Sequence, residues 1–202
     1  GDIGCLSFNA NKIITTGSGG AIITNNRNLY LKAQYLANQA KDDTFNYIHH
    51  ECGYNYKMNG LNASLGLTQI SKLSNKITKR KNVYKRYNYN FKSHSKIRIL
   101  DLTDVSKINY WINVVYFEKL GYQNVEKLSI FLKKKNIETR RVWRPLNLQR
   151  HLRNFETFNI KNSERLYNNS LCLPSNDTLS KKDIDKVCNC IKNFYENITS
   201  HK

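Results

Sequence analysis

The chain has 202 residues, 40% of them hydrophobic, and a formal net charge of +18. This length suits one domain, or one and a fraction, and the hydrophobic content with its periodicity excludes a disordered chain. No apolar run reaches the about 18 residues that a membrane helix needs. We therefore expect a folded chain without a membrane partner.

The positive charge has two interpretations. A charge of this size is typical of proteins that bind nucleic acid or an anionic surface. However, Asn, Lys, Ile and Tyr are all frequent, as A/T-rich codons would produce, and the lysines are spread along the chain. We expect no nucleic-acid partner and a field that favours a phosphorylated, anionic substrate. A basic nucleic-acid-binding protein remains an alternative that rests on charge alone.

The cysteines and the N-terminus bear on the compartment. Five cysteines are scattered through the sequence, which favours reduced cytoplasmic thiols over a disulfide framework. Cys188 and Cys190 would point about 200° apart on a helix, so we expect no metal site there. The first residues show no secretory signal and lead directly into a strand-like run, so we expect the sequence to start in mid-domain.

The first part of the chain is predicted to contain a strand pair and two helices. Residues 5–8 and 21–24 are short apolar runs on either side of the turn-forming Gly17–Gly20. Apolar residues at spacings of three and four predict an amphipathic helix over 28–40. Residues 41–59 are expected to be irregular. Periodicity returns at Leu61 and predicts one long connecting helix to about Tyr89.

The second part, from about residue 95, is predicted to be a small α/β layer. Residues 109–117 are rich in aromatic and β-branched residues and predict a strand. A helix is expected around 125–132 and a further strand over 137–142. Ser180 and Asp183 have the spacing of a capping box and open a final helix. The apolar positions of that helix are Ile184, Val187, Cys188, Ile191 and Phe194.

Lys12 lies among small polar residues between two apolar runs, and three interpretations of this segment remain open. The glycine-rich Gly17–Gly20 could form a phosphate-binding nest, although the pattern of a P-loop is missing. The glycines could instead be a hairpin turn. Finally, Lys12 could be a Schiff-base lysine, which must be presented on a short, rigid loop and shielded from full hydration.

Three blocks of residues occur in order along the chain. They are Ser7-Phe-x-x-x-Lys12 followed by Thr-Thr-Gly-x-Gly-Gly, then Gly53-Tyr-Asn-Tyr-Lys-Met58 with Asn62-Ala-x-Leu65-Gly-x-x-Gln69, and finally Arg140-Arg-Val-Trp143-Arg-Pro145-Leu-Asn147-Leu-Gln149. Together they resemble the signature of DegT/StrS-type sugar-nucleotide aminotransferases, which depend on pyridoxal 5′-phosphate. The resemblance extends over essentially the whole chain, but only over the C-terminal half of a typical family member.

The resemblance implies a fold and roles for individual residues. The fold class would be α/β, the C-terminal part of a fold-type I aminotransferase. Residues 1–90 would form part of the large cofactor-binding domain with a connector helix, and residues 91–202 the small α/β domain. Lys12 would be the catalytic lysine that holds the cofactor. Ser7 would bind the cofactor phosphate, and Asn55 would reach the phosphate of the neighbour in a homodimer.

The resemblance also implies a substrate. Arg140, Trp143 and Asn147 fall in a loop near the sugar nucleotide, while Lys57 stands where many relatives have Arg and loses bidentate recognition. The wording of the first two blocks is closest to enzymes of the N-acetylbacillosamine and legionaminic acid pathways. These aminate the C4 ketone of UDP- or GDP-linked 4-keto-6-deoxy-N-acetylhexosamines, with glutamate as the usual donor.

Some neighbouring residues have simpler explanations. His49 and His50 are expected to be solvated loop residues, and Thr16 and Ser18 to be strand and turn residues. Tyr54 and Trp143 are equally compatible with a core position and with a pocket wall.

The half of the family fold that the resemblance does not cover carries a phosphate-binding helix start and the Asp that pairs with the pyridine nitrogen. We therefore expect this chain to be a fragment, inactive and poorly soluble alone, with exposed strand edges and apolar faces. A non-catalytic remnant or dimerisation module of the same fold is the alternative.

Overall fold

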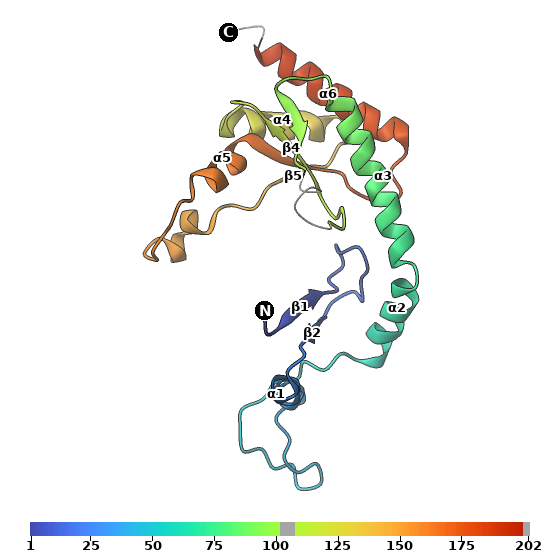
Figure 1. The fold of residues 1–202 in the computed structure, drawn as a ribbon, viewed down its shortest axis with the longest axis vertical. Helices are drawn as coiled ribbons and strands as arrows, with labels where there is room; N and C mark the ends of the chain where they lie inside the picture. The colour runs from blue at the N-terminus through green and yellow to red at the C-terminus, as the bar shows by residue number, and fades with distance from the viewer. Residues whose placement is uncertain (102–107, 200–202) are drawn as a thin grey trace. The chain divides into compact units, whose positions relative to one another are not determined.

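The computed structural model describes residues 1–101 and 108–199 (Figure 1). The chain divides into two compact units, Gly1–Asn75 (unit 1) and Lys76–Lys202 (unit 2). Within the described ranges, no helix is both long enough and apolar enough to cross a membrane. The two units are described separately below.

Unit 1 begins with the predicted strand pair and helix, although the helix ends at Ala37 instead of continuing to Ala40, where Gln39 and Ala40 have positive φ angles. Its elements are β1 (Gly4–Ser7), β2 (Gly20–Ile23), α1 (Arg27–Ala37), α2 (Gly60–Ile70) and the first residues of α3 (Leu73–Phe91). The strands are antiparallel, with Ser7 opposite Gly20. A Cβ at Gly20 would lie 2.4 Å from the Leu6 carbonyl oxygen, so this end of the ribbon requires glycine. The side chain of Asn26 accepts hydrogen bonds from two backbone N–H groups at the start of α1.

The single long helix predicted from Leu61 to about Tyr89 is wrong, because a turn separates α2 from α3. The Ser71 hydroxyl donates to the Thr68 carbonyl at 3.1 Å, and the Lys72 N–H bonds to the Gln69 carbonyl at 3.0 Å. Such local bonds compete with the regular hydrogen bonds of a helix. The spacing of apolar residues in the sequence is almost the same on both sides of the turn, so periodicity did not reveal the break. The units meet inside α3, and the domain boundary at 90/91 stays a prediction.

Unit 2 is an antiparallel sheet with helices packed on it. Its remaining elements are β3 (Ile97–Ile99), β4 (Asn113–Phe117), α4 (Tyr122–Lys134), β5 (Arg140–Arg141), α5 (Lys161–Asn169), β6 (Ser170–Leu173), α6 (Lys181–Thr199) and two short 3₁₀ turns, Leu146–Leu148 and Arg150–Leu152. The strand order is β3-β4-β6-β5, and each neighbouring pair is antiparallel.

The predicted strands of unit 2 were found but are shorter than expected. The strand predicted over 109–117 begins only at Asn113. Before it, Tyr110 has a positive φ of 54°, which a strand cannot contain, and the Trp111 carbonyl accepts from Arg80 of α3 at 2.9 Å. The strand predicted over 137–142 is reduced to Arg140–Arg141. The sequence did not predict β3, α5 or the central β6.

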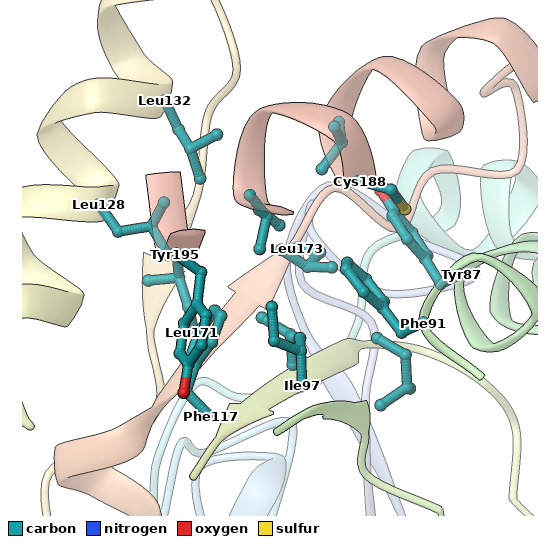
Figure 2. Close-up of a cluster of buried hydrophobic side chains, with 14 of the residues drawn as sticks. Tyr87, Phe91, Ile97, Phe117, Leu128, Leu132, Leu171, Leu173, Cys188 and Tyr195 are labelled. Atoms are coloured by element: carbon teal, nitrogen blue, oxygen red, sulfur yellow. The ribbon is translucent and has the colours of Figure 1, made fainter. Parts of the chain in front are cut away.

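Helices α3, α4 and α6 cover one face of this sheet. Figure 2 shows the buried cluster, with side chains from the three helices directed at those of the strands. The labelled members are Tyr87, Phe91, Ile97, Phe117, Leu128, Leu132, Leu171, Leu173, Cys188 and Tyr195. Alternate residues of β4 are fully buried, as expected for a strand with one covered face.

The predicted start of α6 is confirmed. The Ser180 hydroxyl accepts from the Asp183 N–H at 3.2 Å, and the Asp183 carboxylate accepts from the Ser180 N–H at 3.1 Å. This reciprocal pair is a capping box with Asp in the place of Glu. Four of the five apolar positions predicted for this helix are buried, and Phe194 is half-buried against the core.

Unit 1 buries far less apolar surface than unit 2. Among its residues, only Ile13 and Ala40 belong to the buried hydrophobic set. Neither α1 nor α2 contains a buried residue. Large apolar side chains that stay exposed include Leu61 and Leu67 of α2 and Ile22 of β2. The core of the described chain is therefore in unit 2.

Replacing Leu128, which is fully buried in α4, should destabilise unit 2. Leu128→Ala removes packed methyl groups and leaves a cavity, so the free energy of unfolding should fall by about 2–5 kcal/mol. Ile130→Ala on the same helix, where the side chain is 54% exposed, should change it by less than about 0.5 kcal/mol. Urea titrations followed by circular dichroism measure both. Equal effects would place Leu128 outside the core.

Burial raises the pKa of the Cys188 thiol from 9.0 to about 12. The folded state therefore keeps this proton at pH values where the unfolded state loses it, so the free energy of unfolding should fall as pH rises from about 9 to 12. Cys188→Ala should flatten that slope, by up to about 1.4 kcal/mol per pH unit. Ile130→Ala, which removes no titratable group, should leave the slope unchanged. Urea midpoints measured across this pH range would contradict the assignment if both variants behaved alike.

Candidate active site

Lys12 lies on the loop that joins β1 to β2. Backbone bonds close the base of this loop, from the Phe8 N–H to the Gly19 carbonyl and from the Thr16 N–H to the Phe8 carbonyl, both at 3.0 Å. The Lys12 N–H bonds to the Asn9 carbonyl at 3.0 Å, and the Lys12 side chain is half-buried beside the buried Ile13. The loop is thus short, internally bonded and partly shielded from water.

One face of α2 fixes this loop from the side. The Gln69 side-chain oxygen accepts from the Thr15 N–H at 3.1 Å, and the Asn62 amide donates to the Thr16 carbonyl at 2.8 Å. Between them on the helix lies Gly66, where a Cβ would be only 2.8 Å from the Thr16 methyl carbon. These positions share one face of a helix because they are four and three residues apart. All three positions belong to the second sequence block, but the sequence alone does not indicate their contact with the Lys12 loop.

The glycine turn serves as a scaffold in this structure. Gly17 and Gly19 have φ angles of 83° and 98°, which side-chain-bearing residues rarely adopt. The Gly17 N–H donates to the Thr15 hydroxyl at 2.8 Å, so this N–H is already used within the loop. The Thr16 hydroxyl donates to the Ser18 carbonyl. The structure therefore favours the hairpin-turn interpretation over the phosphate nest. Ser18 lies in the turn as expected, whereas Thr16, which was expected in a strand, lies in the loop between β1 and β2.

Ser7 and Lys12 lie on the same connection between β1 and β2. Ser7 ends β1 with its side chain exposed, five residues before Lys12. Its hydroxyl is 3.5 Å from the Asn9 N–H, which is a weak interaction at most. The hydroxyl is therefore available to a ligand near the start of the loop.

The segment with Asn55 lies along the end of α1. The Tyr54 N–H donates to the Leu36 carbonyl at 2.7 Å, and the Tyr56 N–H donates to the Ala37 carbonyl at 2.9 Å. The rings of Tyr54 and Tyr56 stack with centroids 5.1 Å apart, so both lie on one side of the extended segment. Asn55, between them, then projects to the other side, and it is exposed.

This segment touches the Lys12 loop through Met58. The methyl carbon of Met58 is 3.1 Å from the position that a Cβ on Gly19 would take. Lys57, just before it, is exposed. The structure thus places the Asn55 segment and the Lys12 loop in one connected part of unit 1.

The two histidines that were expected to be solvated also bind neighbouring groups. The His49 Nδ1 atom is 2.8 Å from the Gln39 carbonyl, and the His50 Nδ1 atom is 2.9 Å from an Asp42 oxygen. The backbone N–H of His50 donates to the same carboxylate, which lowers the pKa of Asp42. The hydroxyl of Tyr35 also donates to it at 3.0 Å. These contacts organise the loop between α1 and α2.

Unit 2 contributes the third group of candidate residues, beginning at β5. Arg140 pairs with Cys172 of β6, and Arg141 pairs with the buried Leu171. Because neighbouring strand residues point to opposite faces, Arg141 lies on the helix-covered face and Arg140 on the other, where it is exposed. The adjacent arginines therefore have different environments.

Trp143 and Asn147 follow β5 in the same segment. Trp143 is 63% exposed and its ring lies 6.1 Å from that of Trp111. Tyr54 of unit 1 is 50% exposed, so neither aromatic is a core residue. The Asn147 amide donates to the Glu164 carboxylate of α5 at 2.9 Å. Arg140, Trp143 and Asn147 thus belong to one segment of unit 2, whereas the residues around Lys12 belong to unit 1.

A lysine on a rigid hairpin loop, held by a helix and contacted by an Asn-bearing segment, is an arrangement suited to imine chemistry. The chain belongs to the DegT/DnrJ/EryC1/StrS aminotransferase family, whose model matches residues 1–192. This confirms the resemblance seen in the three sequence blocks.

Individual relatives agree with this assignment. One relative is EpsN of Bacillus subtilis, which is provisionally named as a pyridoxal phosphate-dependent aminotransferase. It is 27% identical to this chain, over 100% of this chain and 53% of its own length. A UDP-4-amino-4,6-dideoxy-N-acetyl-beta-L-altrosamine transaminase of Helicobacter pylori is 26% identical over 95% of this chain and 52% of its own. The chain therefore spans about half the length of the curated relatives it matches.

A solved structure confirms the fold class. The crystal structure of the aminotransferase TlmJ from Streptoalloteichus hindustanus superposes with a TM-score of 0.88 at 23% identity. The match covers 98% of this chain and 53% of TlmJ. The fold is thus α/β and corresponds to about half of the TlmJ aminotransferase fold.

Gly53 should be essential for placing the Asn55 segment. A Cβ at Gly53 would lie 2.3 Å from the Ala40 backbone nitrogen, so Gly53→Ala must push the segment away from α1. The amide protons of Tyr54 and Tyr56, which donate to α1, should then exchange faster, by about tenfold or more for each bond weakened by about 1.4 kcal/mol. Hydrogen exchange read by NMR measures this. Gly60→Ala, where a Cβ meets no atom within 4 Å, is the matched control and should leave both amides protected; equal exchange in the two variants would contradict the tight approach.

Proposed function

We propose that this chain is part of a cytoplasmic, PLP-dependent sugar-nucleotide aminotransferase. It would transfer an amino group, with glutamate as donor, to the C4 ketone of a nucleotide-linked 4-keto-6-deoxy-N-acetylhexosamine used for a bacterial surface glycan. The observation that carries this proposal is Lys12, on a loop that α2 fixes through Asn62 and Gln69, in a chain matched by the aminotransferase family over residues 1–192.

The donor groups around Lys12 suit a phosphorylated aldehyde cofactor. Lys12 supplies an amine that can hold the aldehyde carbon, and the exposed Ser7 hydroxyl is a neutral donor for the phosphate; the exposed Asn55 amide is a neutral donor for the phosphate bound by the neighbouring subunit. When bound, pyridoxal phosphate supplies an electron sink that stabilises negative charge on the carbon carrying the amino group. In this proposal Lys12 holds the cofactor, and Ser7 and Asn55 bind its phosphate, with Asn55 acting across a homodimer interface.

Lys12 also has a proton-transfer role in the proposal. With the cofactor bound, the Nζ atom of Lys12 would act as the base and acid that moves a proton at the carbon carrying the amino group. This task needs an amine held near that carbon, because positioning supplies much of the rate of such a transfer. The bonds from Thr15 and Thr16 to α2 support this, since they fix the loop on which Lys12 lies. Lys57 lies in the Asn55 segment and carries a positive charge. Its only proposed role is to attract an anionic ligand electrostatically.

The segment after β5 is proposed to bind the sugar nucleotide. Arg140 offers an exposed guanidinium for phosphate oxygens, and Trp143 offers an exposed ring for a base or sugar. The N-acetylhexosamine preference rests on the wording of the first two sequence blocks and is supported by the name of the Helicobacter pylori relative. Because this name contains UDP, a UDP-linked sugar is the substrate to test first.

We propose that turnover also requires the half of the fold that the relatives have and this chain does not span. Unit 1 leaves apolar side chains such as Leu61 and Leu67 exposed, and its helices α1 and α2 have no buried residue. Large exposed apolar side chains on neighbouring turns of a helix are typical of a surface that contacts another polypeptide layer. The large domain of the proposal comprises residues 1–90 together with that layer, residues 91–202 are the small domain, and turnover requires both.

Reduction with borohydride in the presence of pyridoxal phosphate should mark Lys12 selectively. Peptide mapping by mass spectrometry should find the phosphopyridoxyl group on Lys12 in at least about ten times the amount found on exposed lysines such as Lys133, since Lys12, unlike Lys133, lies in a fixed, partly shielded loop. Lys12→Arg should abolish the main product, whereas Lys133→Arg should not.

Two results would contradict the proposal. Labelling of surface lysines in proportion to their exposure would remove the special role of Lys12. Production of amino sugar from glutamate and a UDP-4-keto-6-deoxy sugar by the 202-residue chain alone would contradict the requirement for the unmatched half.

A further inference from the structure

Helix α5 holds both ends of the segment that carries Arg140, Trp143 and Asn147. At one end, Arg141 donates to the Tyr167 carbonyl at 2.9 Å. At the other end, the Asn147 amide donates to Glu164 at 2.9 Å. Glu164 and Tyr167 are three residues apart in one helix, so a single helical turn fixes the segment twice.

The Arg141 end is fixed by more than one contact. Its guanidinium carbon lies 4.3 Å from the ring centre of Tyr122 on α4 and 4.9 Å from that of Tyr167 on α5. The planar cation is thus held between two aromatic faces. This leaves Arg140 and Trp143, which flank the fixed point, exposed on a segment whose backbone is held in place.

At the Asn147 end, the orientation of the side-chain amide is defined. A carboxylate accepts hydrogen bonds but cannot donate them, so the Asn147 group facing Glu164 must be the NH₂. The other atom of the amide, Oδ1, is buried and has no hydrogen-bond partner within the part of the chain that the structure describes. A buried acceptor in this state is normally completed by water or by a ligand.

We propose that Glu164 is a positioning residue that makes Asn147 a hydrogen-bond acceptor for the sugar nucleotide. The partner of Oδ1 is then a donor of the ligand, a sugar or ribose hydroxyl or a base or acetamido N–H. Phosphate oxygens are acceptors and are excluded as its partner, so this residue recognises the organic part of the ligand while exposed cations such as Arg140 attract its phosphates. The inference rests on the proposed function, because it takes the segment after β5 to be a substrate-binding loop.

Glu164→Gln is the direct test, since it keeps the size of the side chain but adds a donor. The new amide can donate to Oδ1, which lets Asn147 turn and lose its free acceptor. With UDP-N-acetylglucosamine as the probe, isothermal titration of the 202-residue chain should show affinity weakened about five- to tenfold, the effect of one hydrogen bond. Asn147→Ala should weaken it to a similar extent, and the double variant should be no weaker than either. Glu126→Gln, the same change on the exposed face of α4, should have no effect.

Inorganic pyrophosphate separates positioning from general damage to the loop. Its affinity should stay within about twofold in Glu164→Gln and Asn147→Ala, because phosphates do not use Oδ1. An NMR readout that needs no ligand completes the test: the Asn147 side-chain NH₂ should exchange slowly in the unsubstituted chain and faster in Glu164→Gln.

The outcomes distinguish this inference from the function on which it rests. If the unsubstituted chain does not bind UDP-N-acetylglucosamine, the proposed substrate role of the loop is wrong and this inference fails with it. If the probe binds equally to the unsubstituted chain and to Glu164→Gln, only the inference fails. If pyrophosphate and the nucleotide sugar lose affinity together, Glu164 is structural and its role in orienting Asn147 is refuted.

Discussion

Two hydrogen bonds from α2 determine where Lys12 is. Gln69 and Asn62 bind the backbone of Thr15 and Thr16, so the loop between β1 and β2 is attached to a helix as well as closed on itself. The close approach at Gly66 depends on the same face of α2, and the contact of Met58 with Gly19 joins the Asn55 segment to the loop. Without these bonds Lys12 would be one of many lysines in a strongly basic chain.

Different interactions stabilise the two units. Unit 2 has a continuous core between its sheet and three helices, and its loop after β5 is fixed by side chains of that well-packed body. Unit 1 depends mainly on backbone and amide hydrogen bonds, because only Ile13 and Ala40 belong to its buried apolar set. Burial of apolar surface is the dominant stabilising term in folding. The Lys12 loop therefore belongs to a unit with little buried apolar surface, whereas the loop after β5 belongs to a unit with its own core.

The sequence predicted the elements that have a clear local signal. Helix α6 combines a capping box with a strong apolar stripe, and β1 and β2 flank a glycine turn. Strand β6 was not predicted, because all four of its residues are buried and they show neither alternation nor length. The break between α2 and α3 was missed because the apolar spacing continues across it.

The candidate site could also be predicted only where the sequence has a local signal. Lys12 could be distinguished by its neighbouring residues, and the roles of Ser7 and Asn55 came from the family resemblance. The contacts of Gln69 with Thr15 and of Glu164 with Asn147 join residues distant in sequence and required the structure.

The most direct test of the account compares the order of the Lys12 loop with the reactivity of Lys12. In Gln69→Ala, hydrogen exchange should show that the Thr15 amide loses protection, because its acceptor is gone. The rate at which pyridoxal phosphate and borohydride modify Lys12 should fall in the same variant toward that of an exposed lysine. If the Thr15 amide is released and Lys12 is modified as fast as before, the helix does not prepare Lys12 for its chemistry, and the central claim is wrong.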